Sequence, residues 1–148
     1  MREHDMLVWE NAKKMFKKYY TNWTQPQFDV ADILINTIYN YIDSLNLYIP
    51  PMLPWLDEDS TLNLWWRIQG FKTFYVEIEE DLTISFAYLD SYRPAFNIKD
   101  LVHGSITDPH SLSDHCKETM QHLLSTEPYE TALPESYFKY IEGLKLDS

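Results

Sequence analysis

Residues 61–89 read TLNLWWRIQGFKTFYVEIEEDLTISFAYL, and this stretch decides the fold. Apolar side chains recur at every second position, which is the period of a strand that buries one face. Turn residues interrupt the alternation at Gln69-Gly70 and at Glu80-Asp81. We therefore expect strands at residues 61–68, 71–79 and 82–89, joined into an antiparallel meander. The expected core positions are Leu62, Leu64, Trp66, Ile68, Phe74, Val76, Ile78, Leu82, Ile84, Phe86 and Tyr88.

Two helices are expected before this sheet. An apolar stripe with residues spaced three and four apart predicts a helix over residues 5–19, and it consists of Met6, Trp9, Ala12, Met15, Phe16 and Tyr19. Thr24 as a cap and Pro26 in the first turn predict a second helix over residues 28–45. These two helices are the expected cover for the core face of the meander. The prolines Pro50, Pro51 and Pro54 then predict a rigid connector that holds Trp55 and Leu56 in place.

The part of the chain after the meander has weaker signals. Residues 90–110 are typical of a long irregular connection, with a short fourth strand around residues 96–98. Ser111 and Asp114 form a capping pair for a helix over residues 111–125, and Pro134 and Gly143 bound another at 134–143. These two helices either complete the core or cover the outer face of the sheet. We expect one α+β domain over residues 1–148, with a three- or four-stranded antiparallel meander packed against N-terminal and C-terminal helices.

Charge and aromatic content together limit the classes of partner. The 148 residues are 45% hydrophobic and 16% aromatic, so the chain should fold despite a formal net charge of -11. Residues 21–66 contain six Asp or Glu residues and neither Lys nor Arg. Such a surface repels nucleic acid and attracts basic protein surfaces. We therefore expect no direct binding to nucleic acid.

Composition also argues against several other classes. The chain has three Gly, too few for the glycine-rich loops that bind phosphate groups. One Cys excludes an internal disulfide, and the polar N-terminus lacks the apolar core of a signal peptide. No run of about 18 apolar residues indicates a membrane-spanning helix. The expected protein is cytoplasmic, binds no membrane and has no cofactor.

Histidines and the cysteine form the cluster most capable of metal binding or acid-base chemistry. It consists of His103, His110, His115 and His122, together with Cys116 and Asp114. On a helix, residues 115 and 122 stand two turns apart, about 10 Å, so one zinc ion would need other ligands. Paired acids at positions 77 and 79, about 6.5 to 7 Å apart on one strand face, are expected to be solvated. We expect no catalytic residue and no metal ligand, and a small metal-binding or hydrolytic enzyme remains an alternative.

A protein-binding role uses more of the same residues. The outer face of the meander would present Trp65 and Tyr75 within an acidic surround, and Trp and Tyr are typical of interface hot spots. In the alternative, a C-terminal helix covers this face and both rings belong to the core. The predicted partner-binding residues are Trp65, Tyr75, Glu77, Glu79, Glu80, Asp81, Asp57, Glu58 and Asp59.

The order of several motifs over about residues 19–90 resembles small uncharacterised bacterial proteins found near toxin-antitoxin and other mobile-element genes. Their pattern has a tryptophan and a proline before a helix, a proline-rich connector, an acidic turn and a strand with tryptophan. Here it reads Asn22-Trp23, Pro26, Pro50-Pro51, Asp57 to Ser60, Leu62-Asn63-Leu64-Trp65, Val76-Glu77-Ile78 and Leu82-Thr83-Ile84-Ser85-Phe86. The paired glycines of that pattern are replaced by Asp59-Ser60. The resemblance implies an interaction or inhibitor role without a catalytic residue to transfer.

The leading hypothesis is a small acidic, non-enzymatic inhibitor from a bacterial or phage mobile element. It would bind a basic, nucleic-acid-handling protein, such as a nuclease or effector complex, and block it, as an anti-CRISPR protein or an antitoxin does. Opposite charge would accelerate the association. An oligomeric structural protein is a further alternative, since the sequence does not define the oligomeric state.

Overall fold

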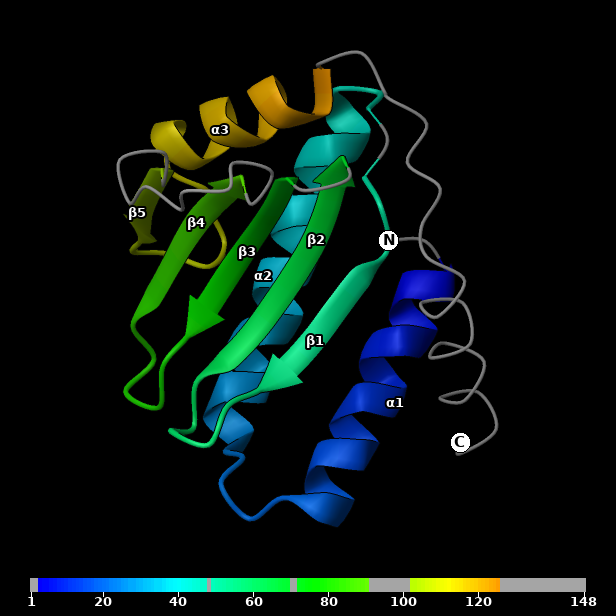
Figure 1. Cartoon of the computed structure of the whole chain (residues 1–148), viewed down its shortest axis with the longest axis vertical. Coiled ribbons are helices and arrows are strands. Elements are labelled where there is room, and N and C mark those ends of the chain that lie inside the picture. The colour runs from blue at the N-terminus through cyan, green and yellow to red at the C-terminus, as the bar shows by residue number, and fades with distance from the viewer. Residues whose placement is uncertain (1–2, 48, 70–71, 91–101, 126–148) are drawn as a thin grey trace.

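The computed structural model describes residues 3–47, 49–69, 72–90 and 102–125, and these residues form an α+β fold. Helices α1 (Glu3–Tyr19) and α2 (Gln25–Ser44) precede strands β1 (Met52–Leu56), β2 (Leu62–Gln69), β3 (Lys72–Ile78), β4 (Ile84–Asp90) and β5 (Val102–Ile106), and helix α3 (Asp114–Ser125) follows them. The predicted α+β fold class is therefore confirmed, although the sheet has five strands instead of three or four (Figure 1).

The five strands form one antiparallel sheet in the order β1-β2-β3-β4-β5. The three predicted strands are its central members, β2, β3 and β4. Their register places Trp65 opposite Tyr75 and Asn63 opposite Glu77. Successive side chains of a strand point to opposite faces, so these four residues share the outer face.

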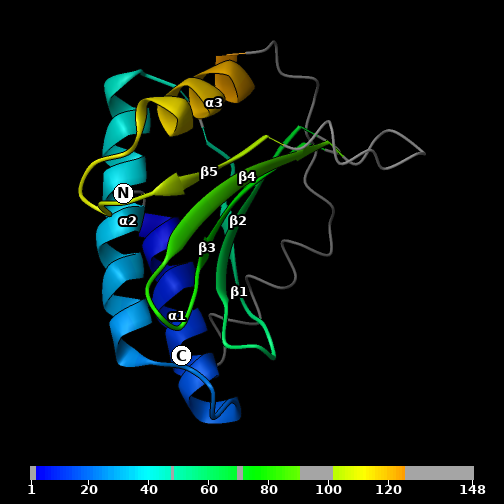
Figure 2. The ribbon, with the colours of Figure 1, turned by 90° about the vertical axis from the view of Figure 1, so that its left-hand side faces the viewer.

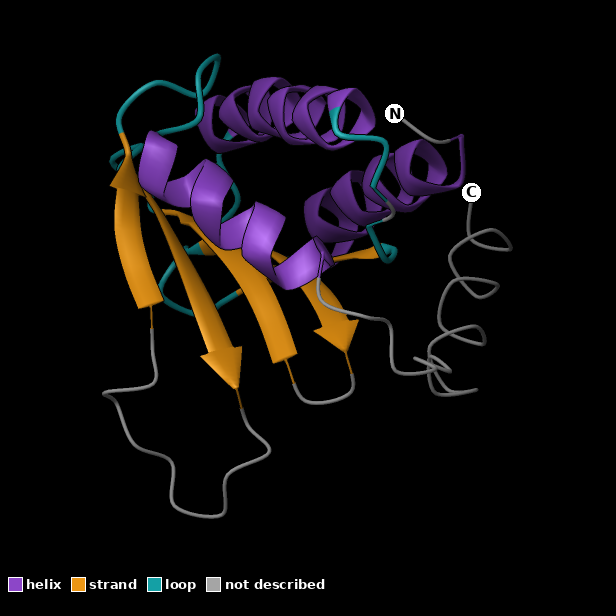
Figure 3. Cartoon of the chain, turned by 90° about the horizontal axis from the view of Figure 1, so that it is seen from above, coloured by secondary structure: helices purple, strands orange, loops and turns teal. Residues whose placement is uncertain are grey.

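All three described helices lie on one side of the sheet (Figures 2 and 3). One buried cluster combines residues of α1, α2, all five strands and α3. Its largest side chains include Trp9, Trp66, Tyr39, Phe16 and Phe28. Helix α3 contributes Cys116 and Met120 to this cluster, and so completes the core instead of covering the outer face. The helix expected at residues 134–143 lies outside the described residues.

Strand β1 was not expected, because its prolines indicated a connector. Pro54 lies in an edge strand, where a missing backbone N–H leaves the ladder to the neighbouring strand intact. Met52 and Leu56 are buried, as the alternation of a strand requires. The expectation that Trp55 is held down is only half right, since its side chain is 57% exposed while its indole N–H donates to Asp57.

The third predicted strand begins two residues late. Leu82 was expected in the core but is exposed and has a φ of 72°, in the left-handed region. Its N–H donates to the carbonyl of Glu79, so it closes the turn between β3 and β4. The strand starts at Ile84, which is buried.

The fourth strand also differs from the expectation. The positions 96–98 lie outside the described residues, and the strand observed after β4 is β5, at the sheet edge. The cap of α3 is Ser113, whose hydroxyl accepts the N–H of Cys116, and not Ser111. The predicted cap of α2 is confirmed, because Thr24 Oγ1 accepts the N–H of Gln27.

Helix α1 packs through the predicted stripe, with two differences. Trp9, Ala12 and Phe16 are buried, whereas Met6 and Tyr19 are exposed. One lysine, Lys13, pairs with Asp32 of α2 at 3.2 Å. Among the helices in the described part of the chain, none has the length and apolar character needed to cross a membrane.

Candidate protein-binding surface

The two acidic turns lie at the same end of the sheet (Figure 1). One joins β1 to β2 and the other joins β3 to β4, and alternate turns of a meander share an end. We call seven carboxylates at this end the acidic end: Asp57, Glu58, Asp59, Glu77, Glu79, Glu80 and Asp81. Sequence reasoning named all seven, and the topology brings their two groups together.

Gln27, in the first turn of α2, ties these two turns to each other. Its side chain is buried, and its Nε2 donates to the carbonyl of Ser60 at 2.6 Å and to that of Ile78 at 2.9 Å. Its Oε1 accepts the hydroxyl of Thr24. The helix start therefore fixes the spacing between the turn that contains Ser60 and the turn that follows Ile78.

The Asp57 carboxylate is held by two donors from the outer face. Its Oδ1 accepts a hydrogen bond of 2.7 Å from the indole N–H of Trp55. Its Oδ2 accepts a hydrogen bond of 2.8 Å from Nδ2 of Asn63. Asn22, in the loop between α1 and α2, donates to the main-chain carbonyl of Asp57 at 2.8 Å. Two contacts thus hold this half-buried carboxylate, and the third holds the main chain that carries it.

Glu77 shows that the carboxylates of the acidic end repel one another. Burial raises its pKa above the ordinary value, and the negative charges of Asp57, Glu79 and Asp59 raise it further. Within the described residues, no Lys or Arg pairs with any of these four carboxylates, and the ion pairs observed there involve Lys13. A cation arriving from outside would relieve this repulsion.

A pair of aromatic rings, exposed at Trp65 and half-buried at Tyr75, adjoins the acidic end. Trp65 and Tyr75 stack with ring centroids 5.3 Å apart and planes inclined by 24°. Trp65 is 37% exposed, whereas its neighbour Trp66 is fully buried in the core. Burial, followed by the charge of Glu77, raises the pKa of the Tyr75 hydroxyl. The rings therefore face the outside of the sheet, and the Tyr75 hydroxyl lies close enough to Glu77 for this charge to raise its pKa.

The remaining predicted residues occupy the tips of the turns. Glu58, Asp59, Glu79, Glu80 and Asp81 are exposed. Hydrogen bonds from Thr83 lower the pKa of the Asp81 carboxyl, and its Oδ1 accepts the Thr83 N–H at 2.9 Å. This bond fixes the turn and keeps the carboxylate charged.

The histidine and cysteine cluster has a different character. Cys116 is fully buried, and burial raises the pKa of its thiol to about 12. His103, His110 and His115 are exposed, and no group of three or more His, Cys, Asp or Glu residues able to hold a metal ion occurs within the described ranges. The side chain of His122 lies outside the description. The thiol is protonated at neutral pH and so is a poor nucleophile.

Sequence reasoning missed the residues that support the site. Gln27, Asn22, Trp55 and Asn63 hold the acidic end in place. The partners of Gln27 and Asn22 lie 33 to 51 positions along the chain, and no local motif reveals them. The topology itself was a usable signal, because a meander sends its first and third turns to the same end.

Comparison of this chain with protein-family models, with curated proteins and with solved structures found no match in any of the three. The resemblance to mobile-element proteins therefore stays a prediction.

Proposed function

We propose that the protein is a non-enzymatic inhibitor that binds a basic, nucleic-acid-handling protein through the acidic end and the Trp65–Tyr75 pair. The observation that carries this proposal is the shared position of two acidic turns next to the stack of the exposed Trp65 on the half-buried Tyr75. Anti-CRISPR proteins and antitoxins of ribonucleases are classes that fit it, with a bacterial cell or phage host as the setting.

The chemistry of the surface favours arginine and lysine from the partner. A guanidinium group can stack on an aromatic face and form two hydrogen bonds with a carboxylate. Trp65 supplies the ring and Glu77 the carboxylate, and both lie on the outer face of adjacent strands. Binding such a cation would also remove the repulsion that raises the pKa of Glu77.

The same charges favour a nucleic-acid-handling partner. Proteins that bind nucleic acid place Lys and Arg against phosphate groups, and these contacts supply much of their affinity. Seven carboxylates at one end of a sheet can occupy such a surface in place of phosphates. The positions are fixed by Gln27, Asn22 and Asn63, so little ordering remains to be done on binding.

The proposal is tested by using the full chain as bait in a lysate of its native host. Three baits are compared: the wild type, the site variant E77Q/E79Q/E80Q/D81N, and the control variant E3Q/D29N/D43N/E118Q. Both variants lose four charges, but the control changes exposed acids outside the acidic end. We expect a basic partner on the wild type and the control that the site variant fails to hold and that added salt releases.

The purified partner is then assayed for nucleic-acid binding or cleavage with increasing amounts of the protein. The proposal predicts inhibition by the wild type and by the control variant, and little by the site variant. A partner that all three baits hold equally, or whose activity the protein leaves unchanged, would contradict it.

Two alternatives can be separated by direct measurement. An enzyme or metal protein centred on His110, His115, Cys116 and His122 predicts bound metal in the purified protein and loss of function in Cys116→Ala. An oligomeric structural protein that associates through Trp65 predicts a stable assembly by mass measurement in solution, which Trp65→Ala would dissolve.

A further inference from the structure

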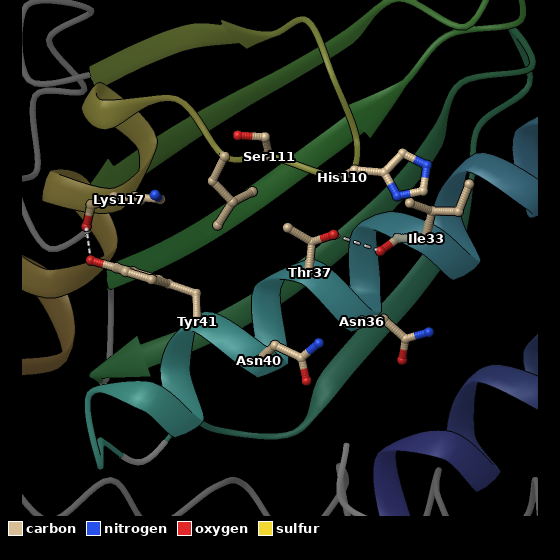
Figure 4. A pocket seen from close by; sticks show the side chains of 9 residues that line it. Ile33, Asn36, Thr37, Asn40, Tyr41, His110, Ser111 and Lys117 are labelled. Carbon is tan, nitrogen blue, oxygen red and sulfur yellow. Dashed lines mark hydrogen bonds between the residues drawn. The ribbon is translucent and has the colours of Figure 1, made fainter.

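A hollow lies between α2 and the segment that leads into α3, and none of the residues that line it belongs to the acidic end. Its volume is about 560 Å³, and it combines amide, hydroxyl and apolar groups. Ile33, Thr37 and Tyr41 of α2 line it on one side, and residues 110–112 and Lys117 line it on the other (Figure 4). The hydroxyl of Thr37 donates to the carbonyl of Pro109 at 2.6 Å and so ties the two walls together.

Tyr41 of α2 and Lys117 of α3 lie next to each other at one end of this hollow. The hydroxyl of Tyr41 donates to the main-chain carbonyl of Lys117 at 3.4 Å and joins α2 to α3 (Figure 4). The ammonium group of Lys117 lies 5.7 Å from the centroid of the Tyr41 ring. Lys117 has no ion pair with any of the described residues. A negative group at the end of a ligand that lies along α2 could therefore pair with this ammonium group.

Two exposed amides line the hollow along α2. Asn36 and Asn40 are one helical turn apart, and their side chains form no hydrogen bond within the described part of the chain. Four residues of helix rise about 6 Å, and two residues of an extended chain advance about 6.6 Å. A primary amide offers both a donor and an acceptor, as a peptide group does. The two amides are thus spaced to meet alternate peptide groups of an extended chain.

Other ligand classes fit less well. A sugar would need a free aromatic face, and the face of the Tyr41 ring is near the Lys117 ammonium. A nucleotide would need more cationic groups than the single lysine that lines the hollow. A metal ion would need a group of three ligating side chains, which the described residues lack.

We propose that this hollow binds the C-terminal end of an extended peptide, with main-chain groups on Asn36 and Asn40 and the terminal carboxylate on Lys117. From Ile33 to Tyr41 the helix advances about 12 Å, which accommodates about four extended residues at roughly 3.3 Å each. This peptide site is separate from the acidic end, so the two proposals can fail independently.

The probe is a positional-scanning library of N-acetylated tetrapeptides with a free C-terminal carboxylate, added at millimolar concentration to the full-length, isotope-labelled protein. We expect shifts of the side-chain amide signals of Asn36 and Asn40 in NMR spectra. The C-terminally amidated form of the best peptide should bind about ten-fold more weakly, since it lacks the charge that pairs with Lys117.

Variants locate the site. Asn36→Ala with Asn40→Ala should weaken binding of the best peptide at least about ten-fold, and Lys117→Glu should weaken it by at least as much. Gln121→Ala and Lys14→Glu are matched controls, because both side chains are exposed and lie outside the hollow, and these should leave binding within about two-fold. Absence of binding across the whole library, equal binding of the amidated peptide, or sugar binding in its place would overturn the proposal.

Discussion

The side-chain amide of Gln27 donates a hydrogen bond of 2.9 Å to the carbonyl of Ile78, across 51 positions of sequence. The same nitrogen donates to the carbonyl of Ser60 at 2.6 Å. One buried side chain at the start of α2 therefore joins the two turns that carry the acidic end. A surface made of solvated turns would vary in shape, and this contact fixes the spacing of the two turns.

Gln27→Met should remove both bonds while keeping the volume of the side chain. Two carbonyls would lose a buried donor, and we expect the free energy of unfolding to fall by about 1 to 3 kcal/mol. Urea unfolding followed by tryptophan fluorescence measures it. Gln25→Met is the control, because that amide bonds only to Asp29 on the exposed side of the helix. Equal stability of the two variants would show that the Gln27 bonds contribute nothing.

Gly104→Ala should destabilise the edge of the sheet. An added Cβ would lie 2.7 Å from Cε1 and Cζ of Phe86, which pairs with Gly104 across the strands, and 3.2 Å from Nδ1 of His115. Overpacking of this kind reduces stability by about 1 to 3 kcal/mol. The double variant with Phe86→Leu should lose less than the sum of the two single losses, because the smaller side chain makes room. Strict additivity would contradict a clash between these two residues.

Glu77→Gln should make the protein more stable at pH 7. The pKa of Glu77 is raised above the ordinary 4.5 by burial and by neighbouring carboxylates, so the folded protein binds this proton more tightly than the unfolded chain. Between the two pKa values, the contribution of Glu77 to stability therefore rises as the pH falls. The gain from the variant should be less than about 1 kcal/mol, because solvent screens this half-exposed group.

Thermal unfolding of both proteins from pH 7 to pH 4 measures this effect. The difference between them should shrink as the pH falls through the titration of Glu77. Glu118→Gln, on the exposed side of α3, serves as the control. A Glu77→Gln variant that is less stable at pH 7 would mean that the charge of Glu77 stabilises the fold, which is incompatible with net repulsion at the acidic end.

Cys116 should be unreactive in the folded protein. Its thiol is fully buried and burial raises its pKa to about 12, whereas thiol reagents attack the thiolate. We expect labelling by a disulfide reagent at pH 8 to proceed at the rate of unfolding, and to become immediate in guanidinium chloride. Immediate labelling of the folded protein would instead favour the alternative in which Cys116 is a nucleophile.

The sequence predicted the parts of the fold where periodicity is strong. The alternation over residues 61–89 identified three strands and most of their core side chains, and Thr24 identified the start of α2. The sequence did not predict β1, because Pro54 indicated a connector instead of an edge strand. It did not predict β5 either, because this strand has few alternating residues and they include Gly104 and His103. Short edge strands are defined by their neighbours, and periodicity carries little of that information.

The candidate site was predicted residue by residue, but its arrangement was not. Trp65 and Glu77 were named from the pattern of the strands, and the outer face holds them as expected. The bonds of Gln27 and Asn22 span 51 and 35 positions and have no local signature. The hollow beside Asn36 likewise joins residues that are far apart in the chain, so only tertiary structure reveals it.

The central claim, that the acidic end and the Trp65–Tyr75 pair form one recognition surface for cationic protein, is tested most directly with a nine-residue arginine peptide. Calorimetric titration at physiological ionic strength compares the wild type, E77Q/E79Q/E80Q/D81N and E3Q/D29N/D43N/E118Q. Charges more than about 8 Å from the peptide are then largely screened. The claim predicts at least about a ten-fold loss of affinity in the first variant and less than about a three-fold loss in the second. Equal losses in both variants would show that net charge alone attracts the peptide, and would contradict the claim.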